Sequence, residues 1–96
     1  MAYDPGAIDA ALAAAVGDEP ALIAELRLAF VESAARALAT LETATDDEEW
    51  RIAASRLKGL AASFGAVRLM ALATEAVAMP QDAAMLARLR RSIARL

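Results

Sequence analysis

The chain has 96 residues, which is enough for one domain with a single hydrophobic core. Its formal net charge is −3, and this acidic balance argues against a nucleic-acid partner, because nucleic acids require a basic surface. The chain contains no cysteine and no histidine, so disulfides, the usual zinc ligands and the commonest general base near neutral pH are all missing. We therefore predict no metal site and no cofactor.

The composition favours helix over sheet. Alanine and leucine, which stabilise helices, are abundant, whereas β-branched and aromatic residues, which favour strands, are few. Charged residues interrupt every apolar stretch well before the ~18 residues that a membrane span needs, and no signal segment opens the chain. We expect an all-α protein that is soluble, cytoplasmic and without a membrane partner.

The first predicted helix is short and the second is long. Asp4 and Pro5 are typical of a helix start and Gly17 of a helix end, so the first helix runs to about Val16. Pro20 starts a second helix over about 20–43. Apolar residues recur at helical spacing and predict inward-facing stripes of Ile8, Leu12 and Val16 in the first helix, and of Leu22, Leu26, Phe30, Ala37 and Leu41 in the second.

The third predicted helix begins at a capping box, with Thr45 as the N-cap and Glu48 three residues later. It runs to about Ser63, and Gly65 is a plausible left-handed stop. Its predicted core stripe consists of Trp50, Ala53, Leu57, Leu60, Ala61 and Phe64. The opposite side, which we expect to face solvent, carries Arg51, Ser55, Lys58, Gly59 and Ala62.

A proline separates the last two predicted helices. The fourth spans about 66–78 and ends before Pro80, because the residue that precedes a proline avoids the α region. The fifth spans 81–95, and we interpret its four arginines as a solvated face at the negative helix end, rather than as a binding patch. The residues expected to face inward are Val67, Met70, Leu72 or Ala73, and Val77 in the fourth helix, and Met85, Leu86, Leu89 and Ile93 in the fifth.

The links between the last four helices are short, which makes consecutive helices antiparallel. The sequence therefore predicts an up-down four-helix bundle with a short extra helix at the N-terminus, in a single domain that spans residues 1–96.

Gly59 is the unexpected residue of the third helix. A glycine inside a helix costs about 1 kcal/mol relative to alanine. Close packing of helices would explain such a glycine, but the apolar stripe places Gly59 on the solvent side. We interpret it as clearance for a partner that approaches the backbone near Ser55, with Lys58 offering a positive charge to an acidic group.

The segment from Ala54 to Ala66, ASRLKGLAASFGA, resembles the signature of histidine-containing phosphotransfer (HPt) domains of bacterial phosphorelays. That signature is a histidine, any residue, Leu, Lys and Gly, followed by small residues and a later Gly. The entry to the long helix at Gly17–Leu22, and the stretch from Leu69 to Val77, also resemble the family. The resemblance covers the chain from about residue 6 to the C-terminus and implies the same helical bundle.

The resemblance implies roles for three positions of the outward face, those of Ser55, Lys58 and Gly59. In the family, an exposed histidine carries a phosphoryl group and exchanges it with the aspartate of a receiver domain. Lys58 matches the lysine that assists the phosphoryl oxygens, and Gly59 matches the glycine that makes room for the partner. Ser55 stands where the histidine belongs. A serine hydroxyl needs an adjacent base to become a nucleophile, and Glu48 is two turns away, so we expect no phosphotransfer activity.

The leading hypothesis is an HPt-like adaptor that binds a response-regulator receiver domain, or a histidine kinase, through Arg51, Ser55, Lys58, Gly59 and Ala62. Three alternatives remain. The chain is a working relay protein in which Ser55 replaces the native histidine, or a structural or dimerising bundle with a fossil motif, or a protein in which Ser55 is the target of a serine kinase. The sequence does not identify the partner, the pathway or the oligomeric state.

Overall fold

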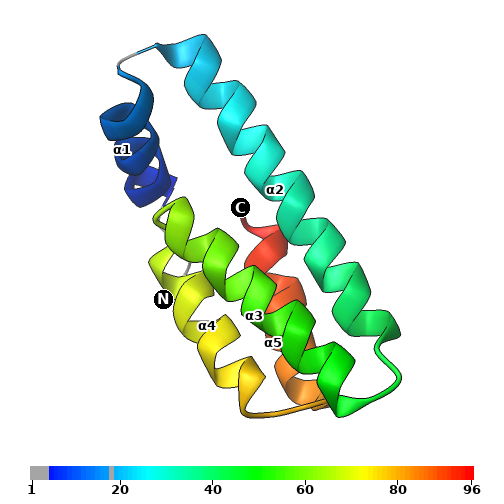
Figure 1. Cartoon of the computed structure of the whole chain (residues 1–96). Coiled ribbons are helices and arrows are strands. Elements are labelled where there is room, and N and C mark those ends of the chain that lie inside the picture. Colours follow the sequence, from blue (N-terminus) through cyan, green and yellow to red (C-terminus); the bar gives the residue numbers. More distant parts are fainter. Residues whose placement is uncertain (1–4, 18) are drawn as a thin grey trace.

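The computed structural model describes residues 5–17 and 19–96, and these residues form five α-helices and no strand (Figure 1). The helices are α1 (Pro5–Val16), α2 (Pro20–Thr43), α3 (Asp47–Ser63), α4 (Val67–Val77) and α5 (Ala83–Ala94). The predicted all-α class is confirmed, and the helices lie within a few residues of their expected bounds. The predicted helix cap Asp4 lies outside the described residues.

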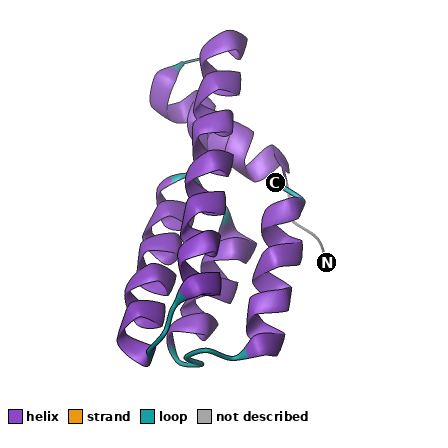
Figure 2. Ribbon diagram, turned by 90° about the vertical axis from the view of Figure 1, so that its right-hand side faces the viewer, coloured by secondary structure: helices purple, strands orange, loops and turns teal. Residues whose placement is uncertain are grey.

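Four of the helices form the predicted up-down bundle. α3 packs against α2 and α4, and α5 closes the ring by packing against α4 and α2 (Figures 1 and 2). The extra helix α1 packs against α2. The 24 residues of α2 give it a length of about 36 Å, so α2 runs along the whole bundle. Because α3 lies between two neighbours, one side of it remains open to solvent.

The core consists of apolar side chains from all five helices. Among the largest buried side chains are Phe30 and Leu41 of α2 and Trp50 and Leu57 of α3. Phe30 stacks on Phe64, with the ring centroids 4.8 Å apart. No polar or charged side chain is buried within the described ranges. A core without polar groups holds the bundle together but offers no chemistry, so a functional site has to lie on the surface.

Most of the predicted inward stripes are confirmed. The predicted core residues that are buried are Ile8, Leu12, Phe30, Ala37, Leu41, Trp50, Ala53, Leu57, Ala61, Ala73, Met85, Leu89 and Ile93. Those that are half-buried are Leu22, Leu26, Leu60, Phe64, Met70, Leu72, Val77 and Leu86. The side chain of Val16 is not among those described.

The predicted orientation of α4 is wrong at Val67, whose side chain is 63% exposed. The buried residues of α4 are Leu69, Ala73 and Ala76. Val67 lies two residues before Leu69, which is about 200° around the helix, so the two side chains point to opposite sides. Leu69 and two small alanines, rather than Val67, form the inner surface of this helix.

The predicted capping box at the start of α3 is displaced by one residue. The N-cap is Asp46, not Thr45, and the Asp46 carboxylate accepts a hydrogen bond from the backbone N–H of Glu49 at 2.8 Å. The Glu49 carboxylate in turn accepts from the backbone N–H of Thr45 at 2.7 Å and from its hydroxyl at 3.0 Å. Because four acidic residues follow one another here, the sequence does not show which residue caps the helix. The extended backbone of Asp46 identifies this residue as the N-cap.

The end of α3 is a Schellman motif, as Gly65 predicts. Gly65 has a φ of +71°, and its N–H donates to the carbonyl oxygen of Ala62 at 3.3 Å. The N–H of Ala66 donates to the carbonyl oxygen of Ala61 at 2.9 Å. This turn reverses the chain directly into α4 and fixes α4 beside α3.

Helix α5 begins two residues later than predicted. Gln81 has a φ of +56°, which a right-handed helix does not allow. Asp82 is the N-cap, and its carboxylate accepts a hydrogen bond from the N–H of Met85 at 2.7 Å. The Gln81 side chain donates to the Asp47 carboxylate at 2.9 Å, which ties this loop to the start of α3.

Candidate functional site

The outward face of α3 contains the five residues that the sequence singles out, namely Arg51, Ser55, Lys58, Gly59 and Ala62, and all five are exposed. The structure brings them together because they follow helical spacing on the side opposite the buried Trp50, Ala53 and Leu57. We call these five residues the α3 face. Their shared exposure is an observation, and their role in binding stays a prediction.

Gly59 has no structural role that requires a glycine. It lies inside α3, and a Cβ at this position would meet no atom within 4 Å other than those of its chain neighbours and of the backbone of its own helix. Gly65 and Gly17, by contrast, have positive φ angles that favour glycine. The fold therefore tolerates a side chain at position 59, and its absence leaves the helix backbone accessible from outside one turn after Ser55.

Three cations surround Ser55 without an internal partner. Arg51, Arg56 and Lys58 are exposed, and none makes an ion pair or hydrogen bond with another described residue. Two arginines of α5 differ, because Arg90 binds the Glu42 carboxylate at 2.7 Å and Arg88 lies 3.7 Å from the Glu75 carboxylate.

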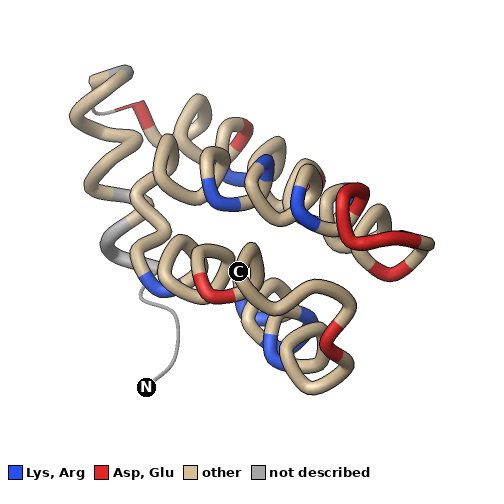
Figure 3. Tube along the Cα trace, turned by 60° about the horizontal axis from the view of Figure 1, so that its bottom comes forward, with Lys and Arg blue, Asp and Glu red and all other residues tan. Residues whose placement is uncertain are grey.

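Within α3, every acidic residue lies in the first turn, at Asp47, Glu48 and Glu49. Many acidic residues of the chain cluster where α2 passes into α3, at one end of the bundle (Figure 3). The middle of α3 therefore presents positive charge that the bundle itself does not neutralise.

Ser55 has no neighbour that could activate its hydroxyl. The chain contains no histidine, and the Ser55 hydroxyl makes no hydrogen bond within the described part of the chain. Glu48, the carboxylate on the same side of α3, lies seven residues earlier, which is about 10 Å along the helix axis. A general base has to lie within about 3 Å of the proton that it removes, so the α3 face provides none.

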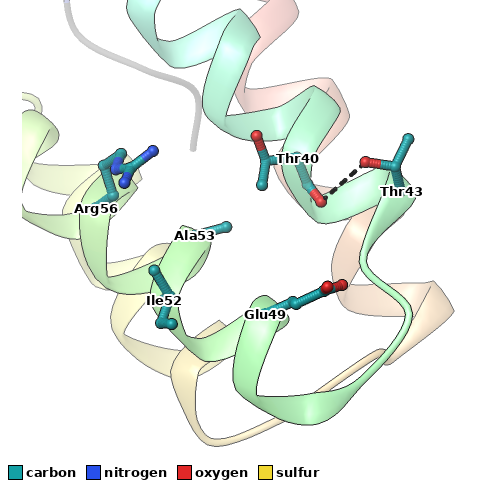
Figure 4. Close-up of a pocket in the computed structure, with 6 residues that line it drawn as sticks. All are labelled: Thr40, Thr43, Glu49, Ile52, Ala53 and Arg56. Atoms are coloured by element: carbon teal, nitrogen blue, oxygen red, sulfur yellow. Dashed lines mark hydrogen bonds between the residues drawn. The ribbon is translucent and has the colours of Figure 1, made fainter.

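A groove of about 360 Å³ lies beside the α3 face, on the side of α2 (Figure 4). Its lining residues are Thr40 and Thr43 from α2 and Glu49, Ile52, Ala53 and Arg56 from α3. Ile52 lies about 60° and Arg56 about 100° around the helix from Ser55, whereas Lys58 lies about 60° in the other direction. The groove therefore borders the α3 face along one edge.

The sequence reasoning missed Ile52 and Arg56. Ile52 is a large apolar residue, yet its side chain is 55% exposed. A signal was present in the sequence, because Ile52 falls outside the apolar stripe of α3 and three residues before Ser55. What the sequence could not supply was the packing of α2, which turns the surface around Ile52 into a groove.

The structure holds no metal-binding group of three or more acidic, histidine or cysteine side chains in the part of the chain that it describes. Over the same residues, none of the helices has both the length and the apolar character that crossing a membrane requires.

A family model described as Hpt domain matches residues 25–96, three quarters of the chain. The match includes most of α2 and all of α3, α4 and α5, and with them the whole α3 face. Comparisons with curated proteins and with solved structures gave no match.

Proposed function

Because the chain belongs to the Hpt domain family, we propose that it binds a response-regulator receiver domain, or a histidine kinase, without itself carrying a phosphoryl group. Membership places the chain in phosphorelay signalling, where Hpt domains carry phosphoryl groups and interact with receiver domains and kinases. The proposal concerns what this chain does within that framework.

The observation that supports docking is the bare backbone at Gly59. This glycine costs the helix about 1 kcal/mol, and nothing inside the bundle requires it. A partner that approaches the helix closely at this position explains the cost. The unpaired Arg51 and Lys58 support the same conclusion, because unneutralised cations around such a contact favour an acidic partner.

The observation that argues against phosphotransfer is the residue at position 55. By the motif, Ser55 occupies the position of the family's phosphoacceptor histidine. A serine hydroxyl has a much lower nucleophilicity than a neutral imidazole unless a base removes its proton, and the α3 face has no base. A serine phosphate ester would also return the group to an aspartate only with difficulty, so Ser55 would end a relay rather than continue it.

The test compares the protein with its Ser55→His variant against purified receiver domains and kinases of the same organism. Binding is measured by calorimetry, and phosphoryl uptake is measured with a radiolabelled phosphorylated receiver. We expect both forms to bind at least one common partner. Only the histidine variant should acquire label, since its imidazole attacks the aspartyl phosphate, the P–O bond to the aspartate breaks and an N–P bond forms.

A bulky residue at position 59 tests the docking geometry. Gly59→Leu should weaken binding by about tenfold or more, because the side chain occupies the space that the partner needs. Ala84→Leu, on an exposed position of α5, is the matched control and should leave affinity unchanged. The proposal is wrong if the unmodified protein binds no receiver or kinase, or if it acquires label on Ser55.

A further inference from the structure

The polar side chains that line the groove beside the α3 face are almost all occupied. The hydroxyl of Thr40 donates to the carbonyl oxygen of Arg36 at 3.1 Å, and that of Thr43 donates to the carbonyl oxygen of Ala39 at 3.0 Å (Figure 4 shows its second contact, with the Thr40 carbonyl). The Glu49 carboxylate is held by the backbone and the hydroxyl of Thr45.

Among the described residues that line the groove, Arg56 is therefore the only one whose side chain has free hydrogen-bond donors. Its guanidinium makes no ion pair or hydrogen bond with the described residues. Both threonine protons are used, Glu49 is an acceptor, and Ile52 and Ala53 have no polar side-chain atoms. A ligand in the groove finds the apolar side chain of Ile52 and, at Arg56, one cation that suits a carboxylate, while the Glu49 carboxylate lies seven residues before Arg56, about 10 Å along the helix axis.

The apolar part of the wall is unusually exposed for an isoleucine. Ile52 leaves 55% of its side chain in contact with solvent, and covering it would remove apolar surface from water, which favours association. The groove volume of about 360 Å³ is near the lower end of the range for ligand pockets, about 300–1,000 Å³. This size suits a single side chain of a protein partner better than a large cofactor.

We propose that this groove is a second contact point for the docking partner, which inserts an apolar side chain against Ile52 and places an adjacent carboxylate on Arg56. This inference rests on the proposed docking function and specifies the partner's chemistry at Ile52, which precedes the family motif, and at Arg56, whose residue type the motif leaves open. The groove borders the α3 face, so a partner that covers Ser55 reaches it without a change in the bundle. Arg56 and Lys58 would then hold acidic groups on opposite sides of Ser55.

The test uses a receiver domain or kinase that the unmodified protein binds, and four variants. Ile52→Asp and Arg56→Glu change the groove. Leu28→Asp is the control for Ile52, because Leu28 has a similar exposure of 58% on the side of α2 away from its core-facing residues. Arg91→Glu, on the exposed surface of α5, is the control for Arg56. Circular dichroism melts verify that each variant is folded.

We expect Ile52→Asp and Arg56→Glu each to weaken binding by about tenfold, with the loss from Arg56→Glu shrinking at high salt. The controls should remain within about twofold of the unmodified protein. If Gly59→Leu abolishes binding while both groove variants bind normally, the groove inference is wrong and the docking function stands.

Two further outcomes are decisive. If no partner binds the unmodified protein, both proposals are wrong. If the protein is a dimer in solution and Ile52→Asp makes it monomeric, as light scattering would show, a second copy fills the groove and the inference is overturned.

Discussion

The indole N–H of Trp50 donates a hydrogen bond to the carbonyl oxygen of Ala76 at 2.7 Å, and this contact joins the beginning of α3 to the end of α4. The Ala76 carbonyl also accepts from the N–H of Met79 at 3.0 Å. Its regular helical donor would be residue 80, but Pro80 has no N–H. The indole N–H therefore uses hydrogen-bonding capacity of the Ala76 carbonyl oxygen that Pro80 leaves free. The contact also fixes the rotation of α3 about its axis, and this rotation exposes Ser55.

Trp50→Phe should destabilise the bundle by about 1–3 kcal/mol. The substitution removes a buried hydrogen bond and leaves a space where the larger indole was. Urea denaturation followed by circular dichroism measures the loss. Arg51→Ala, at the exposed neighbouring position, should change the free energy of unfolding by less than about 0.5 kcal/mol. An unchanged midpoint for Trp50→Phe would show that the indole does not anchor α4.

The two glycines at the middle and the end of α3 should respond to alanine in opposite ways. Gly59→Ala should raise the free energy of unfolding by up to about 1 kcal/mol, because the position is helical and open. Gly65→Ala should lower it by about 1–2 kcal/mol, because φ is +71° there. Thermal and urea unfolding of both variants measure the difference. A destabilising Gly59→Ala would mean that the glycine serves the fold, which would remove the main support for docking.

A third prediction concerns the residues that cap the start of α3. Asp46→Ala should cost about 1 kcal/mol, since it leaves the N–H of Glu49 without its cap. Glu49→Ala should also destabilise the helix start, because Glu49 holds Thr45. Glu48→Ala, at the position that the sequence pattern favoured, should have a smaller effect. Equal losses at positions 48 and 49 in denaturation experiments would contradict the observed register.

The sequence was sufficient for the helices, their order and the exposed side of α3. Those features depend on local signals, namely the periodicity of the apolar residues and the positions of proline and glycine. The composition, which favours helix, leaves few alternative secondary structures. Prediction from the sequence failed where contacts with neighbouring elements decide which side chain is buried or which residue caps a helix. The apolar spacing predicts Val67 in the core, but Leu69, Ala73 and Ala76 form the inward side of α4. Asp46 is one of four consecutive acidic residues, and the sequence pattern alone does not select it as the cap of α3.

The candidate site, too, could be predicted from the sequence only in part. Arg51, Ser55, Lys58, Gly59 and Ala62 could be placed on one face from their spacing alone. The groove could not, because it forms only when the end of α2 lies beside Ile52 and Arg56. Surface hollows arise between elements, and a single helix pattern contains no information about them.

The α3 face contributes no buried side chain to the bundle. Substitutions at Ser55 or Lys58 therefore leave the core intact, and selection for a folded protein does not act on them. A histidine at position 55 therefore needs no compensating change in the core, and the Ser55→His variant should fold as the unmodified protein does. The stability of the bundle and the chemistry of the α3 face can therefore be changed independently of each other.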